Sequence, residues 1–115
     1  GRAKEFEVYY HVANAQGKQL WSIRIPRFRT LEKNVDTPNG EIDLLAVTRR
    51  GKRWAFEVKW RNKACGIREI TSLLAKTDAD RYIVLSRKGF TSAAHGRFDR
   101  QKNVTMVDLE RQGQT

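Results

Sequence analysis

The segment from Arg53 to Trp60 constrains the fold of this chain more than any other stretch. Its large apolar residues occupy every second position: Trp54, Phe56, Val58 and Trp60. Such alternation is typical of a β-strand, because successive side chains point to opposite faces of a sheet. The other face carries Glu57 and Lys59. On an exposed strand these two charges would simply be solvated, but in an apolar strand they are rarely buried without partners, so they indicate a functional site.

The rest of the chain predicts helices and strands arranged around this segment. In chain order we expect a helix over 3–16, strands over 20–25, 41–48 and 53–60, a helix over 67–76, a strand over 81–86, a short helix that Thr91 caps and that ends near 98 or 100, and a strand over 104–109. Residues 27–39 show no period and are expected to be a polar connection, and residues 110–115 are expected to fray. An antiparallel hairpin followed by βαβ units implies an α/β fold with a mixed β-sheet flanked by helices.

The two longer helices are predicted from apolar residues three and four positions apart. In the first helix these are Phe6, Tyr9, Tyr10 and Ala13, and in the second they are Ile67, Ile70, Leu73 and Leu74. Gly17 is expected to stop the first helix. Pro26 is expected to end the strand over 20–25 or to mark a sheet edge.

A short glycine-containing turn over 49–52 is expected to pair the strands on either side of it. Pairing about this turn would set Thr48 opposite Arg53 and bring Asp43 close to Val58 and its acidic neighbour. A shift of one residue would turn every side chain to the other face. The sequence therefore leaves the register of this hairpin open.

Asp43, Glu57 and Lys59 together have the composition of a phosphate-cleaving site. Two carboxylates suit a hard divalent cation, which polarises a phosphoryl group and lowers the pKa of bound water. A lysine beside them can hold or activate the attacking water. Strand residues two positions apart share a face, so Glu57 and Lys59 are expected to point the same way.

The charge balance adds a second indication. The 115 residues, a length that fits one domain over 1–115, include 23 Lys and Arg against 13 Asp and Glu, for a net charge of +10. A small domain this basic usually binds a polyanion, most often nucleic acid, although a basic face can also serve solubility alone. The candidate phosphate-binding residues fall into three groups: Arg49, Arg50, Lys52 and Arg53; Lys59, Arg61, Lys63 and Arg68; and Arg24, Arg27, Arg29 and Lys33.

Several classes of protein are not expected. No apolar run approaches the roughly 20 residues that a membrane helix needs, and no signal peptide is expected before the first charged residues. A lone Cys65 excludes an intramolecular disulfide, and neither His11 nor His95 has the spacing of a metal ligand. The expected location is a reducing, prokaryotic cytoplasm.

The stretches Gly40–Val47 and Phe56–Arg61 resemble the core motif of the restriction-endonuclease-like nucleases, the PD-(D/E)xK superfamily. That superfamily has a mixed sheet with an αβββαβ core, which agrees with the order of elements predicted above. Residues 82–94, in which a Gly-Phe-Thr turn precedes a helix, are similar to Mrr-type domains and to nuclease-like domains fused to prokaryotic ATPases. Ile42 stands where many members have proline, as is common in the Mrr-like and Holliday-junction-resolvase branches.

The resemblance implies roles for individual residues. Asp43 matches the first metal-ligating aspartate, Glu57 the second carboxylate and Lys59 the lysine, and the carbonyl of Val58 would be a further metal ligand. The family often adds a glutamate from its first helix. The residues open for additional acidic roles are Glu7, which follows Phe6 as in the family, its competitor Glu5, and Glu41. The implied cofactor is Mg²⁺, for which Mn²⁺ would substitute.

The expected function is therefore a metal-dependent endodeoxyribonuclease that acts on duplex or branched DNA and could work as a homodimer. The alternative from another class is a non-catalytic nucleic-acid-binding module that retains the nuclease fold, attached to a larger ATPase-containing protein. A third alternative is a domain whose basic face binds an acidic protein. The complete set of Asp43, Glu57 and Lys59 favours the enzyme, since a binding module has no need of it.

Overall fold

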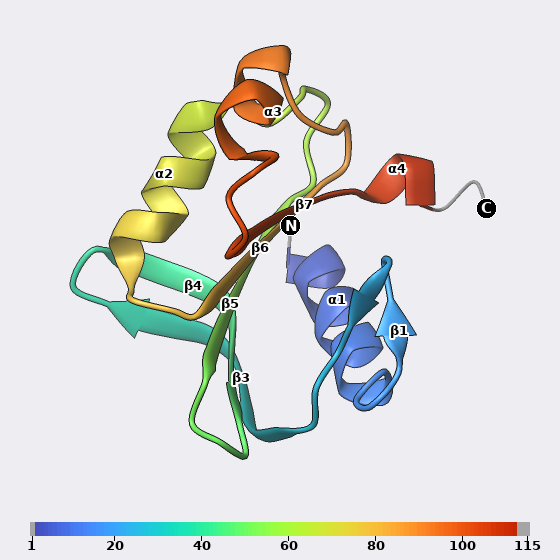
Figure 1. The fold of residues 1–115 in the computed structure, drawn as a ribbon, viewed down its shortest axis with the longest axis vertical. Coiled ribbons are helices and arrows are strands. Elements are labelled where there is room, and N and C mark those ends of the chain that lie inside the picture. Colours follow the sequence, from blue (N-terminus) through green and yellow to red (C-terminus); the bar gives the residue numbers. More distant parts are fainter. Residues whose placement is uncertain (1, 113–115) are drawn as a thin grey trace.

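A five-stranded sheet forms the centre of the computed structural model, which describes residues 2–112 (Figure 1). In spatial order its strands are β3 (Phe28–Thr37), β4 (Gly40–Thr48), β5 (Arg53–Lys59), β6 (Arg81–Ser86) and β7 (Val104–Asp108). β3, β4 and β5 pair antiparallel, whereas β5, β6 and β7 run parallel. The mixed sheet and the αβββαβ core expected from the sequence are confirmed.

The two faces of the sheet are covered by different elements (Figure 1). The first face carries α1 (Arg2–Asn14) and a small hairpin of β1 (Gln19–Leu20) and β2 (Ile23–Arg24). The second face carries α2 (Ile67–Lys76) and α3 (Ser92–Phe98), and a short α4 (Leu109–Gln112) follows β7. None of the helices within residues 2–112 has the length and apolar content that a membrane span requires.

β5 separates the two cores, as its alternation predicts. Trp54, Phe56 and Val58 belong to the cluster beneath α1, and Ala55 belongs to the cluster beneath α2 and α3. Phe56 is fully buried, which stabilises the fold by about 2 to 3 kcal/mol relative to an exposed ring. Glu57, on the side of Ala55, is also buried, whereas Lys59 is partly exposed.

The helix face that packs on the sheet differs from the predicted one. Phe6 and Tyr10 are 47% and 55% exposed, while Val8 and Val12 face the core. The exposed rings pack against each other, with centroids 5.2 Å apart. Aromatic and aliphatic stripes both have helical spacing here, and only the sheet decides which of them is covered.

The strand expected over 20–25 is wrong, because the chain reverses within it. Trp21 and Ser22 have φ of 53° and 62°, which is the left-handed conformation that a tight two-residue hairpin turn requires. Leu20 pairs with Ile23 across this turn. Neither turn residue is glycine or asparagine, so the sequence carries no local signal for a reversal.

The polar connection expected over 27–39 is also wrong, since residues 28–37 form β3. This strand lies at the edge of the sheet, and within residues 2–112 it pairs with β4 alone. Its register shifts between Phe28 and Thr30, and Asn34 has a positive φ of 54°. The apolar residues Phe28, Leu31 and Val35 are three and four positions apart in the sequence, so they do not show the two-residue period of a regular strand.

The other expectations agree closely with the structure. α2 and β6 have the predicted bounds, and Thr91 caps α3 by accepting a hydrogen bond from the backbone N–H of Ala94. Residues 110–112, part of the tail that is expected to fray, lie in α4. The remainder of the expected tail, 113–115, lies outside the described residues.

Candidate active site

The candidate site forms where β4 and β5 separate. The paired residues run from Leu44 opposite Phe56 to Val47 opposite Arg53, one residue away from the pairing of Thr48 with Arg53 expected above. Beyond this ladder, Oδ2 of Asp43 accepts a hydrogen bond of 2.8 Å from the backbone N–H of Val58. A side chain thus takes the place of a backbone partner, and the N–H remains satisfied.

The alternation of β4 breaks at Asp43. Ile42 and Leu45 both belong to the cluster beneath α2, although they are three positions apart, and Leu44 belongs to the cluster beneath α1. The break explains how Asp43 meets residues of α1 rather than those of α2.

Three carboxylates gather at this point. Glu5 from α1 and Glu41 and Asp43 from β4 each offer an oxygen, and these oxygens lie within 4.8 Å of one another. Asn34 of β3 donates hydrogen bonds to Oε1 of Glu5 (3.0 Å) and of Glu41 (3.3 Å). The acidic group therefore comes from α1 and β4, and an amide of β3 holds two of its members.

Burial and nearby negative charge make Asp43 a weaker acid than an exposed aspartate. Burial, and then the negative charge of Glu57, raise the pKa of Asp43 from 3.8 to about 7. The hydrogen bond from Val58 opposes this rise without cancelling it. Burial and a neighbouring negative charge both disfavour the ionised form of a carboxyl group.

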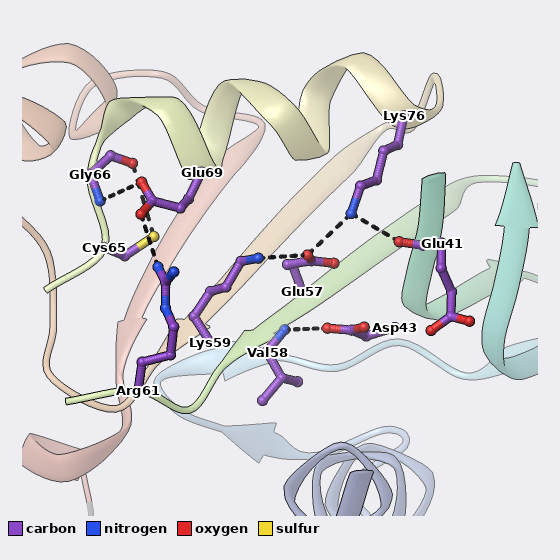
Figure 2. Close-up of polar contacts among 10 residues, drawn as sticks. All are labelled: Glu41, Asp43, Glu57, Val58, Lys59, Arg61, Cys65, Gly66, Glu69 and Lys76. Atoms are coloured by element: carbon purple, nitrogen blue, oxygen red, sulfur yellow. Dashed lines mark hydrogen bonds and ion pairs between the residues drawn. The ribbon is translucent and has the colours of Figure 1, made fainter. Parts of the chain in front are cut away.

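Glu57 lies beside this group and is held by two lysines (Figure 2). Its side chain is only 7% exposed, and Oε2 lies 3.2 Å from Nζ of both Lys59 and Lys76. Oε1 is buried and has no hydrogen-bond partner within the part of the chain that the structure describes. One oxygen of this carboxylate is thus saturated, and the other remains free to accept.

Lys76 is the residue that the sequence-based reasoning missed. It lies at the end of α2, three residues after Leu73 and six after Ile70, both of which are buried. A lysine that continues the apolar stripe of a helix is the signal that could have identified it.

The structure brings Glu5, not Glu7, to Asp43. Glu7 pairs with Nζ of Lys4 at 2.8 Å and lies 3.8 Å from His11, and the hydrogen bond from Lys4 lowers the pKa of Glu7. Glu5 precedes the buried Val8 by three residues and so shares the helix face that meets the sheet. Of the two glutamates that the sequence left open, Glu5 is the one that lies next to Asp43.

The basic residues fall into exposed and engaged groups. Arg49, Arg50 and Lys52 are exposed at the turn between β4 and β5, the opposite end of these strands from Asp43. Together with Arg27 they line a pocket of about 420 Å³ that contains no acidic residue. Arg24, Arg29, Lys33, Lys63 and Arg68 are exposed as well.

Two of the expected phosphate-binding residues are engaged within the protein. Arg53 donates from Nε to the carbonyl of Asp78 and from Nη2 to Oγ1 of Thr77, both at 2.9 Å, which ties β5 to the loop after α2. Arg61 pairs with Glu69 at 2.9 Å. Their guanidinium groups already have acceptors and are less suited to DNA than those of the exposed arginines.

The donor set fits a divalent metal ion. Mg²⁺ and similar hard cations are bound by oxygen ligands, and the group of Glu5, Glu41 and Asp43 supplies three carboxylates within reach of one ion. The unpartnered Oε1 of Glu57 offers a further acceptor nearby, so the chemistry of these donors agrees with a cation site.

The comparison with protein families agrees with this geometry. Residues 7–111 match the family model Mrr_cat, described as restriction endonuclease. The chain therefore belongs to the Mrr-type restriction endonuclease family, a family of nucleases with the restriction-endonuclease-like fold.

The individual proteins that resemble this chain match it over only part of their length or at low sequence identity. The chain is 39% identical over 54 residues to a UPF0102 protein from Sphingopyxis alaskensis, which covers 46% of this chain and 45% of the relative. Among solved structures, a repair endonuclease from Pyrococcus abyssi has a TM-score of 0.57 at 12% identity, over 93% of this chain and 46% of that one. A protein of unknown function has a TM-score of 0.51 at 22% identity, over 66% and 47%. These structures share the fold, and the chain spans about half the length of each relative.

Proposed function

We propose that this domain is a metal-dependent endodeoxyribonuclease, which hydrolyses phosphodiester bonds within DNA. The observation that carries the proposal is the meeting of Asp43, Glu57 and Lys59 at the point where β4 and β5 separate, next to the carboxylates of Glu5 and Glu41. Membership of a restriction endonuclease family supports it.

The carboxylates are the proposed metal ligands. Asp43 and Oε1 of Glu57 would hold a Mg²⁺ or Mn²⁺ ion, with the carbonyl of Val58, Glu5 or Glu41 completing the set. The chemistry that such an ion supplies is polarisation of a phosphoryl oxygen and a lower pKa for water. A bound cation would also favour the ionised form of Asp43, whose pKa is raised by burial and then by the negative charge of Glu57.

Lys59 is the proposed catalytic lysine. Its side chain is 27% exposed and its only charged contact that the structure gives is Oε2 of Glu57, so the ammonium group can turn toward bound DNA. A compact ammonium with three donors can orient an attacking water or stabilise charge on the phosphate. The exposed arginines and lysines would bind the DNA backbone without reading its sequence.

Cleavage of DNA under controlled metal conditions tests this function. We expect cleavage of duplex or branched DNA in Mg²⁺ or Mn²⁺ and none in EDTA. Asp43→Asn and Glu57→Gln should lower the rate by on the order of 10²-fold or more while DNA binding in Ca²⁺ persists. Glu32→Gln, which alters an exposed glutamate of the edge strand, is the matched control and should cleave like the wild type.

The same experiment decides between the enzyme and the binding module. DNA binding without cleavage of any tested duplex, branched or single-stranded DNA, in either metal, would reject the proposal in favour of a non-catalytic module. Equal cleavage by the wild type and Glu57→Gln would reject the assigned site instead.

A further inference from the structure

Lys76 is among the less exposed cationic groups of the described chain, although it lies on a surface helix. Its side chain is 15% exposed. The ammonium lies 3.2 Å from Oε2 of Glu57 and donates a hydrogen bond of 2.9 Å to the carbonyl oxygen of Glu41 (Figure 2). A lysine is buried to this extent only where partners compensate for its lost hydration, and here the partners are two residues of the candidate site.

The surrounding chain is shaped to receive this side chain. Gly40 has a φ of +128°, and a Cβ atom there would lie 3.2 Å from Cε of Lys76. Asn39 donates from Nδ2 to the carbonyl of Ala75 at 3.2 Å. The turn between β3 and β4 is thereby attached to the last turn of α2, and this attachment directs Lys76 across the end of β4 toward Glu57.

The two lysines on Glu57 are not equivalent. The side chain of Lys59 is 27% exposed, and the acceptor that the structure gives its ammonium is Glu57. The side chain of Lys76 is more deeply buried, and its ammonium has a second acceptor in the backbone of β4. Both ammonium groups use Oε2, and neither uses Oε1. If Lys59 turns toward DNA, Lys76 still neutralises Glu57 and still orients its carboxylate.

We propose that Lys76 is a positioning residue of the candidate active site. It holds Glu57 by Oε2, which directs Oε1 toward the metal ligands, and it supplies the fixed counter-charge that allows Lys59 to leave Glu57 and act on the substrate. The catalytic part of this inference rests on the proposed nuclease function, whereas the dependence of Glu57 on Lys76 in the metal-free protein does not.

Substitutions at the two lysines separate these roles. Lys76→Met keeps an unbranched apolar stem and removes the charge, and Lys76→Arg keeps a charge that can donate to both acceptors. We measure single-turnover cleavage at saturating DNA and Mn²⁺, so that weaker binding does not imitate a chemical defect. Lys102→Met, at an exposed residue, is the control and should match the wild type.

Lys76→Met should cleave about tenfold or more slowly, with the dissociation constant for DNA in Ca²⁺ within about twofold of the wild type. Lys76→Arg should restore the rate to within about threefold of the wild type, whereas Lys59→Arg should lose on the order of 10²-fold, because only the reacting lysine depends on a compact ammonium. Cleavage by Lys76→Met within about twofold of the wild type, or failure of Lys76→Arg to exceed Lys76→Met, would overturn the proposal.

Thermal unfolding in EDTA tests Lys76 without any cleavage. Lys76→Met should lower the melting temperature more than Lys59→Met does, and the effect should shrink when Glu57 is already glutamine, because the two residues then no longer interact. An equal effect of Lys76→Met in both backgrounds would show that Lys76 does not act through Glu57. If the wild type fails to cleave DNA, the nuclease proposal falls, and this measurement still decides whether Lys76 holds Glu57.

Discussion

At the scale of single residues, ionisation of Asp43 in the candidate site is unfavourable in the folded protein. Its carboxyl group is partly buried, accepts one hydrogen bond and lies among other carboxylates, so its pKa rises to about 7. Between about pH 4 and pH 7 the folded protein keeps a proton on Asp43 that the unfolded chain releases. Since the folded state binds more protons in this window, the contribution of Asp43 to the free energy of unfolding falls as pH rises through it.

Asp43→Asn should therefore stabilise the metal-free protein at high pH. Asparagine cannot ionise, and its oxygen can still accept from Val58. Solvent reaches part of the group, so we expect a gain in the free energy of unfolding on the order of 1 to 2 kcal/mol at about pH 8 and almost none at about pH 4. Thermal unfolding in EDTA at both values measures it. A gain of the same size at both values would show that ionisation of Asp43 is not its cause.

Glu57 differs from Asp43 because its buried carboxylate is paired with positively charged groups. Two ammonium groups on one oxygen compensate for its burial, whereas the other oxygen is left without a partner. An unpartnered buried oxygen is unusual in a folded protein, and the proposed cation would give this oxygen a partner.

At the scale of secondary-structure elements, the β1–β2 hairpin shows how tertiary packing overrides local preference. Trp21 and Ser22 adopt left-handed φ values that cost roughly 1 kcal/mol each for a residue other than glycine. Leu20, Trp21 and Ile23 pack on the core beneath α1, and this burial offsets the cost. The hairpin closes the face of the sheet that α1 leaves partly open.

Replacement of serine by glycine should have opposite effects on the free energy of unfolding in the β1–β2 turn and in α2. Ser22→Gly relieves the positive φ of the hairpin turn and should raise the free energy of unfolding by about 0.5 kcal/mol. Ser72→Gly, at an exposed position inside α2, should lower it by about the same amount because glycine disfavours a helix. Urea unfolding of both variants measures the difference. Destabilisation by both would mean that the turn carries no backbone strain.

At the scale of the whole molecule, the acidic and basic sites lie at opposite ends of the β4–β5 hairpin. Asp43 and Glu57 lie at one end, and the exposed Arg49, Arg50 and Lys52 lie at the other. A DNA backbone that reaches the carboxylates would therefore meet the basic turn at a different phosphate. The net charge of +10 would keep the acidic group from repelling the DNA as a whole.

Replacing Arg49, Arg50 and Lys52 with glutamine should weaken DNA binding equally for all sequences. Each lost phosphate contact should reduce the slope of log affinity against log salt by about 0.9. Arg97, Arg100 and Lys102, exposed at or after α3, are the matched control: their replacement removes the same charge but should leave the slope nearly unchanged. Titrations at several salt concentrations compare the two triple variants, and equal slopes would place the DNA path elsewhere.

Much of the fold could be predicted because its signals are local. The alternation in β5 and the apolar spacing of α2 follow from the geometry of a strand and a helix, and the glycine turn over 49–52 joins β4 to β5 as expected. The candidate residues Asp43, Glu57 and Lys59 could be recognised because charges inside apolar strands are unusual. Each of these signals can be recognised within its own strand, helix or turn, so no tertiary information is needed to read it.

The remaining features depend on contacts between distant residues. Whether Glu5 or Glu7 reaches Asp43 depends on which stripe of α1 the sheet covers, and both have helical spacing. The pairing of β3 depends on a neighbour, since its apolar residues do not show the two-residue period of a regular strand. Lys76 meets Glu57, 19 residues away, only because α2 crosses the end of β4. The sequence by itself determined the elements with a clear local period, such as α2, β5 and β6, and it supplied Asp43, Glu57 and Lys59 as candidate residues, since these signals arise from neighbouring side chains. The tertiary structure alone decided that Glu5 lies next to Asp43 and that Lys59 and Lys76 both contact Oε2 of Glu57, because these contacts follow from how the elements pack.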